Sequence, residues 1–102
     1  MSDISALHAA LVTRVLDGNG QAPAYLRRAA FNNSGLDSPL SELVDKVVHH
    51  AYAVTDQDIA SASAAGLSED QIFEVVVCAA VGAATRQYQS GLTALDAAAV
   101  VK

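Results

Sequence analysis

The sequence contains few of the residues on which redox, metal-binding and stacking functions depend. Of its 102 residues only one is cysteine and none is tryptophan. A single cysteine excludes a redox cycle within one chain, because that cycle needs an attacking thiolate and a second thiol that resolves the intermediate. The cysteine, Cys78, lies inside an apolar segment, which favours a buried free thiol over a disulfide or a metal ligand.

Basic residues are also scarce. Six Lys and Arg against eleven Asp and Glu give a net charge of −5 and a pI of about 4.8. Nucleic acids and anionic membrane surfaces both attract concentrated positive charge, so neither is an expected partner. The longest apolar run, residues 75–84, reaches about half of the ~20 residues that span a bilayer. Charged residues interrupt the first twenty positions, so no targeting segment is predicted and a cytoplasmic protein is expected.

The remaining composition is typical of closely packed helices. Hydrophobic residues make up 52% of the chain and are mostly Ala, Val and Leu. They recur at helical spacing in successive segments, and no segment alternates as a strand would. We therefore predict a single all-α domain over residues 1–102, a small bundle of about five to six helices. Its parts are N-terminal helices and a loop over 1–37, a core over 38–95 and a tail over 96–102. The fifth helix is expected to end near Gly91, so that residues 92–102 form either a last helix or a frayed tail.

Two helix starts are marked by capping patterns. Thr55-Asp56-Gln57-Asp58 and Ser68-Glu69-Asp70-Gln71 both place a hydroxyl three residues before an acid or amide. The fifth helix, which follows Ser68, is apolar on every face over residues 75–84 and therefore needs cover on every side. Four short helices leave part of it uncovered, so we expect this long Ala-rich helix to mediate oligomerisation. Gly82, among alanines, allows a very close helix contact.

The segment 42–95 also carries a recognisable pattern. It contains a helix-break-helix sequence, a glutamate at position 74 and a long Ala-rich helix through Arg86. The break itself reads Ala64-Ala65-Gly66-Leu67-Ser68-Glu69-Asp70-Gln71-Ile72. Together with the upstream Glu42-Leu43-Val44, these residues resemble the carboxymuconolactone decarboxylase and alkylhydroperoxidase D-like superfamily over about half of the chain. The resemblance implies an all-helical fold and a homo-oligomer, usually a trimer or hexamer, and we expect neither a cofactor nor a metal.

The redox centre of that family is missing. Redox members carry C-x-x-C-x-x-x-H just before the break, and the corresponding positions here are Ala51, Val54 and Asp58. Decarboxylase-type members also place a histidine where Asp58 stands. The family's glutamate matches Glu42 if the connection in this chain is about one turn shorter. The resemblance therefore implies a branch that lacks the CxxC motif and has a degenerate active site.

Several ionisable residues surround this segment and are candidates for function. The catalytic candidates are Glu42, His49, His50 and Asp58, and the ligand-binding candidate is Arg86. A histidine can act as general acid or base near neutral pH, and His49 has Asp45 one turn before it and Tyr52 almost one turn after it. Each candidate also has a structural interpretation. One histidine would be exposed and the other hydrogen-bonded within the bundle or across a subunit contact, the acids would favour helix starts, and the arginine would pair with an acid such as Glu74 or Asp58 at a subunit interface.

Three functions remain open. The first is a decarboxylase-like lyase, with non-redox acid/base chemistry on a small carboxylate or lactone that Arg86 would hold. The second is a non-catalytic homo-oligomeric binding or structural protein on the same scaffold. The third is an adaptor that binds a partner helix in an apolar groove.

Overall fold

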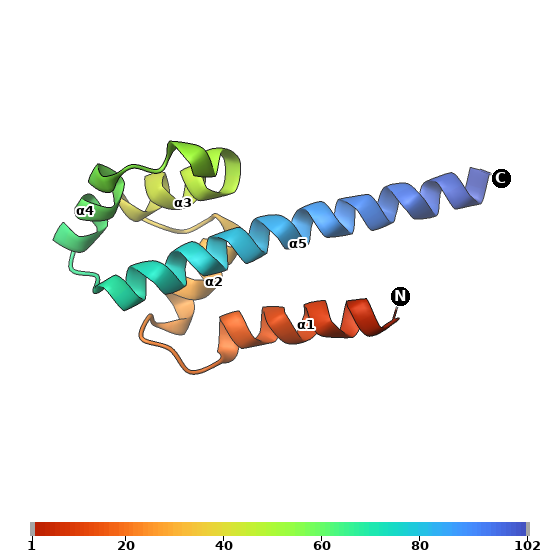
Figure 1. The fold of residues 1–102 in the computed structure, drawn as a ribbon, viewed down its shortest axis with the longest axis horizontal. Helices are drawn as coiled ribbons and strands as arrows, with labels where there is room; N and C mark the ends of the chain where they lie inside the picture. Colours follow the sequence, from red (N-terminus) through yellow and green to blue (C-terminus); the bar gives the residue numbers. More distant parts are fainter. Residues whose placement is uncertain (1, 102) are drawn as a thin grey trace.

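The computed structural model describes residues 2–101 and consists of helices joined by short loops (Figure 1). The elements are α1 (Ser2–Asp17), α2 (Ala24–Asn32), α3 (Leu40–His50), the 3-10 helix η1 (Ala51–Ala53), α4 (Asp56–Ala64) and α5 (Glu69–Val101). No strand occurs in this part of the chain, which confirms the predicted all-α fold. None of the helices formed by residues 2–101 has the length and apolarity needed to cross a membrane.

The predicted helix-break-helix is confirmed between α4 and α5. At the start of α4, the Asp58 amide donates to Thr55 Oγ1 over 3.3 Å, and the Thr55 amide donates to Asp58 Oδ2 over 2.9 Å. Ser68 and Gln71 exchange the same two bonds at the start of α5, over 2.9 and 3.2 Å. Gly66 lies between them at a φ of +107°, a conformation that residues with a Cβ rarely adopt.

Helix α5 is longer than the sequence indicated. It runs without a break through Gly91 to Val101, 33 residues in all, which corresponds to a length of about 50 Å. A separate last helix or frayed tail after residue 95 is therefore wrong. A helical glycine costs about 1 kcal/mol relative to alanine, and the alanine-rich sequence that follows Gly91 favours helix strongly enough to continue it.

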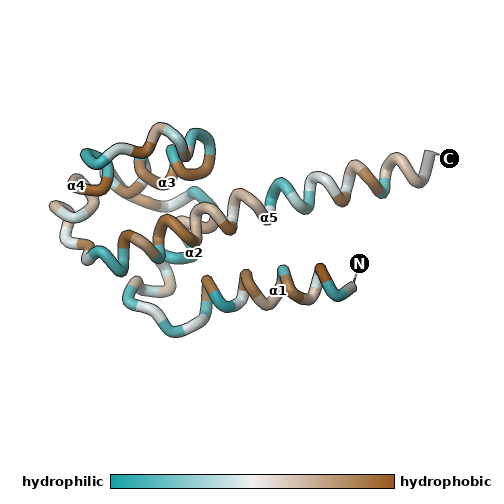
Figure 2. Tube along the Cα trace, viewed as in Figure 1, coloured by the Kyte–Doolittle hydropathy of each residue, from teal (hydrophilic) through white to brown (hydrophobic). Residues whose placement is uncertain are grey.

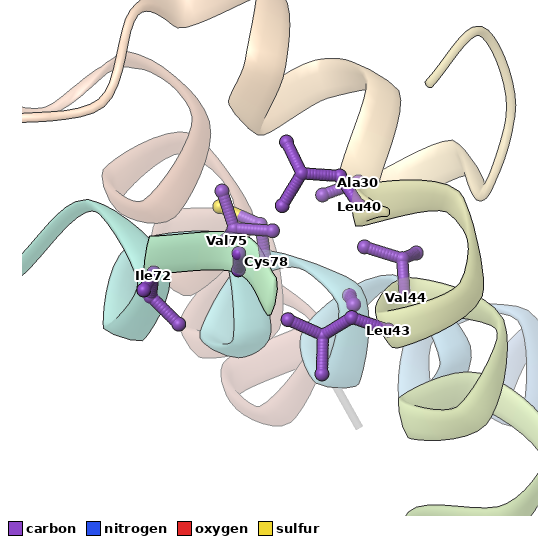
Figure 3. Close-up of a cluster of buried hydrophobic side chains, with 9 residues drawn as sticks. Ala30, Leu40, Leu43, Val44, Ile72, Val75 and Cys78 are labelled. Carbon is purple, nitrogen blue, oxygen red and sulfur yellow. The ribbon is translucent and has the colours of Figure 1, made fainter. Parts of the chain in front are cut away.

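The core lies where α2, α3 and the first half of α5 meet (Figure 3). The largest fully buried side chains are those of Leu43, Val44, Val75 and Cys78. Gly82 is also buried, and a Cβ at this position would overlap the carbonyl oxygen of Phe31 at the end of α2. The close contact predicted for Gly82 is thus made within the chain.

Helix α1 lies antiparallel to α5, and the two described ends of the chain lie at the same end of the molecule (Figure 1). Part of this contact is polar. His8 Nε2 lies 3.0 Å from Thr85 Oγ1, and the Thr85 hydroxyl donates to the Val81 carbonyl over 2.7 Å. Because the Thr85 hydrogen is already used, its oxygen accepts, and His8 Nε2 carries a proton.

The apolar stripe of α1 is covered over only part of its length. Val15 packs against the core, whereas Ile4, Leu7 and Leu11 are 54%, 72% and 47% exposed. On α5, the face that meets α1 continues beyond it: it comprises Thr85, Tyr88, Leu92 and Leu95. Leu95 is 65% exposed, and Figure 2 shows both helices carrying hydrophobic residues out to the open end of the molecule.

Substitution of Gly82 tests the close packing of α5 on α2. We expect Gly82→Ala to lower the free energy of unfolding by about 1–3 kcal/mol, because the new methyl group must push the Phe31 backbone away. Gly91→Ala is the matched control in the same helix: its Cβ would have no atom within 4 Å, so it should raise stability by up to about 1 kcal/mol. Thermal unfolding followed by circular dichroism measures both, and equal shifts would contradict this packing.

Candidate functional site

Glu42 lies in the first turn of α3 and is exposed. Its two carboxylate oxygens each accept from Ser38 Oγ over 2.9 Å, and one also accepts from Ser41 Oγ over 3.1 Å. The Ser38 bond, followed by one from the backbone, lowers the pKa of the Glu42 carboxyl below its usual value. This is the arrangement of an acid that stabilises a helix start, where the positive end of the dipole lies.

Asp58 joins α4 to α3 through an ion pair. Lys46 Nζ lies 3.0 and 2.9 Å from the two Asp58 oxygens, and Thr55 donates to the same carboxylate. The Lys46 bond is the main cause of the lowered pKa of Asp58. A strongly hydrogen-bonded, ionised carboxylate is a weak proton acceptor, so these contacts favour a structural role for Asp58.

The two histidines are exposed at the end of α3. His49 Nε2 lies 3.6 Å from Asp45 Oδ1, which places the predicted acid next to this histidine. Tyr52 contacts His50 instead of His49: its hydroxyl lies 3.4 Å from His50 Nδ1 and the rings meet edge to face. Tyr52 is thus not placed one helical turn after His49, because α3 ends at His50 and η1 changes the direction of the chain.

No hydrogen bond or ion pair joins any two of these four catalytic candidates. Glu42 and His49 are seven residues apart in one helix, which separates their backbones by about 10 Å along the axis. The carboxylates of Glu42 and Asp58 are held by different partners, Ser38 and Lys46. None of the four lines either of the two cavities that α5 borders.

Arg86 caps the end of α2. Its Nη1 donates to the Phe31 carbonyl over 2.7 Å, which satisfies one of the free carbonyls that a helix leaves at its C-terminus. Within one chain Arg86 does not pair with Glu74, which lies three turns earlier and accepts from the Gln21 and Ala22 amides. The pairing with Glu74 or Asp58 at a subunit interface stays a prediction. Arg86 also lines an open cavity of about 590 Å³ whose other walls are polar and alanine side chains of α5.

A cavity of about 570 Å³ between α1, α2 and α5 was not predicted. Its walls are mostly apolar, and its polar groups come from all three helices and the loop after α1. The apolar lining is Leu11, Val15, Phe73, Val77 and Cys78, and the charged lining is Arg14, Arg27 and Glu74. A volume between about 300 and 1,000 Å³ with a few polar groups is typical of small-molecule sites.

Arg27 is the most unusual residue of this cavity, because its side chain is charged and only 8% exposed. Nε donates to the Ala22 carbonyl over 3.1 Å, and Nη1 donates to the carbonyls of Gly18 and Val15 over 2.7 and 3.4 Å. No carboxylate of the described residues lies within ion-pair distance of it. The available sequence signal was its spacing, three residues before the buried Ala30 on the face that meets α5.

Cys78 lies beside this cavity and confirms the predicted buried thiol. It is 1% exposed, and its Sγ donates to the Val15 carbonyl over 3.4 Å. Burial raises the pKa of the thiol, which keeps it protonated and unreactive. Within the described residues, no three His, Cys, Asp or Glu side chains are grouped closely enough to hold a metal ion.

No protein-family model, curated protein or solved structure matches this chain. The functional argument therefore rests on the geometry and chemistry of its own residues.

The Lys46–Asp58 pair can be tested through the pH dependence of stability. Since the pKa of Asp58 lies below its ordinary value of 3.8, ionised Asp58 stabilises the fold above that pH, and the contribution disappears as pH falls through the folded-state value. We expect Asp58→Asn to lower the melting temperature near neutral pH and to match the wild type in strong acid. Asp56→Asn removes the same charge from the same first turn and should have a smaller effect; identical pH profiles for the two variants would contradict the pair.

Proposed function

We propose that this protein is a non-catalytic, homo-oligomeric binding or structural subunit, a branch of the carboxymuconolactone decarboxylase and alkylhydroperoxidase D-like superfamily without the CxxC centre. The main support for the proposal is the large surface area that a single chain leaves exposed to solvent. Its accessible area is 6602 Å², whereas a compact monomer of 10.5 kDa has about 5,400 Å². The excess of about 1,200 Å² exceeds the ~800 Å² that one partner contributes to a standard interface.

The shape of the molecule supports the same conclusion. The radius of gyration is 15.5 Å, against about 13 Å for a typical domain of this length, and the longest extent is 55 Å. The additional length comes from α1 and the second half of α5, which extend away from the compact body formed by α2, α3, α4 and the first half of α5 (Figure 1).

The surface available to a second copy is apolar. We define the open stripe as Ile4, Leu7 and Leu11 on α1 together with Leu95 on α5, all of them large and exposed. Its two halves come from neighbouring antiparallel helices, so two copies related by a two-fold axis would each offer the same patch to the other. A two-fold contact joins chains in pairs, so it would supply one of the interfaces of the hexamer that the resemblance implies, whereas a trimer would need a three-fold contact.

The hydrogen bonds and ion pairs of the catalytic candidates support a non-catalytic role. The carboxylates of Glu42 and Asp58 are engaged in helix-start and ion-pair contacts, and the pKa of each is lowered. His49, beside Asp45, is the one remaining acid/base candidate with a partner that the sequence predicted. Saturable turnover of a small carboxylate or lactone that His49→Ala abolishes would contradict the non-catalytic role. A cytoplasmic location stays a prediction from the composition.

Charge introduced into the open stripe should separate the subunits. We expect wild-type protein at micromolar concentration to have an oligomeric mass by size-exclusion chromatography with light scattering. Leu95→Glu and Leu7→Glu should both shift it to a monomer, because burying an unpaired carboxylate at an interface costs several kcal/mol. Tyr52→Glu is the matched control, since Tyr52 is 88% exposed on η1, outside the open stripe, and should leave the mass unchanged.

Two results would contradict this proposal. One is a wild-type protein that stays monomeric at every concentration tested. The other is an oligomer that dissociates equally with Tyr52→Glu and Leu95→Glu, which would place the interface elsewhere or make the effect non-specific.

A further inference from the structure

We propose that the cavity between α1, α2 and α5 binds a small monocarboxylate with an apolar body, with the carboxylate next to Arg27 and Arg14. The cavity lies on the opposite side of α2 and α5 from the four residues considered as catalytic candidates, and it shares no residue with them. The inference deepens the proposed binding role, and it rests on that proposal in treating the site as one of binding rather than turnover.

The Arg27 guanidinium is buried and only partly hydrogen-bonded. A buried cation is costly unless an opposite charge or a full set of hydrogen bonds compensates for the lost water. Carbonyl oxygens satisfy Nε and Nη1, but Nη2 has no partner among the described residues. Every buried side-chain nitrogen or oxygen of the described residues has a hydrogen-bond partner. Since Nη2 has none, it must be accessible to solvent. The accessible space that Arg27 borders is this cavity.

The positive charge around the cavity exceeds the negative charge, although Glu74 lies close to Arg27. Glu74 also lines the cavity, but its two oxygens accept from the backbone amides of Gln21 and Ala22 over 2.8 to 3.0 Å. Arg14 is exposed, lines the same cavity and makes no recorded ion pair within the described residues. Two arginines and one carboxylate leave one positive charge, which a monocarboxylate would neutralise.

Most of the cavity wall is apolar. Leu11, Val15, Phe73 and Val77 surround the space, and Phe73 is 69% exposed although it is a large aromatic residue. An alkyl or aryl body placed among these side chains would remove their surface from water, which favours binding by about 25 cal/mol per Å² of apolar area. A ligand with a charged head and an apolar body would therefore match both parts of the cavity.

The cavity beside Arg86 matches such a ligand less well. Its walls are Gln89, Ser90, Thr93 and two alanines, so it offers little apolar surface. The Arg86 guanidinium already donates to the Phe31 carbonyl. The charged groups of the two cavities can thus be compared directly, because both sites contain an exposed arginine.

Decanoate, used below its critical micelle concentration, is a suitable probe, with decan-1-ol as the neutral analogue of the same length. We expect isothermal titration of the full-length protein to give saturable binding of decanoate at one site per chain, and at least tenfold weaker binding of decan-1-ol. Arg14→Gln should weaken decanoate binding about tenfold, since a charge-assisted hydrogen bond is lost. Arg28→Gln is the matched control: it removes the same charge from an exposed side chain of α2 that does not line the cavity, so the affinity should be unchanged.

Amide chemical shifts would locate the probe independently of the variants. We expect decanoate to perturb the loop after α1, around Gly18 and Asn19, and the first half of α5. Equal affinity for decanoate and decan-1-ol, a loss caused by Arg28→Gln rather than Arg14→Gln, or shifts confined to the second half of α5 would each overturn the proposal. Light scattering on the same samples keeps this outcome separate from the oligomeric state, because an oligomer that binds no decanoate contradicts only the ligand site.

Discussion

The structure depends on the way α5 holds α2 at both ends. Near the start of α2, Glu74 accepts two backbone amides of the preceding loop, and at its end Arg86 donates to the Phe31 carbonyl. Between these two polar contacts, Gly82 lets the helix backbones meet without a side chain between them. The two charges lie about 18 Å apart along α5, so they fix the position and the direction of α2 together. This clamp also determines where the other helices can bind.

Helices α2 and α3 cover one side of the first half of α5. The rest of the α5 surface is partly covered by α1 and otherwise exposed to solvent. Helix α1 covers part of it through His8 and Thr85, and its contact with the core continues at Val15. The gap that α1 leaves beside the clamp is the cavity that contains Arg27. Beyond α1, the same face of α5 carries Leu95 into solvent. The proposed subunit contact and the proposed ligand site are therefore two consequences of one packing arrangement.

The sequence predicted those features that local chemistry decides. The capping boxes at Thr55 and Ser68 and the break at Gly66 depend on residues within a few positions of one another, and they form as expected. The length of α5 was missed because Gly91 is a helix-ending signal only where the following residues do not favour helix. The likeness of this region to a known superfamily stays a prediction.

Long-range contacts were harder to predict. Nothing near Arg27 in the sequence reveals that the carbonyls of residues 15, 18 and 22 surround it, because these come from another helix and its loop. The same holds for Arg86, whose partner within the chain is a backbone carbonyl that no local pattern of the sequence indicates. Tyr52 lies beside His50, and not one turn after His49, because η1 replaces the helical turn that the spacing assumed.

The central claim is that the second half of α5 is stabilised by another copy of the chain. Amide hydrogen exchange of residues 86–99, measured at protein concentrations above and below the point where the oligomer dissociates, tests this claim most directly. We predict slow exchange in the oligomer and fast exchange in the dilute monomer, because an isolated helical segment of this length is only marginally stable in water. Exchange that is equally slow, or equally fast, at all concentrations would contradict it.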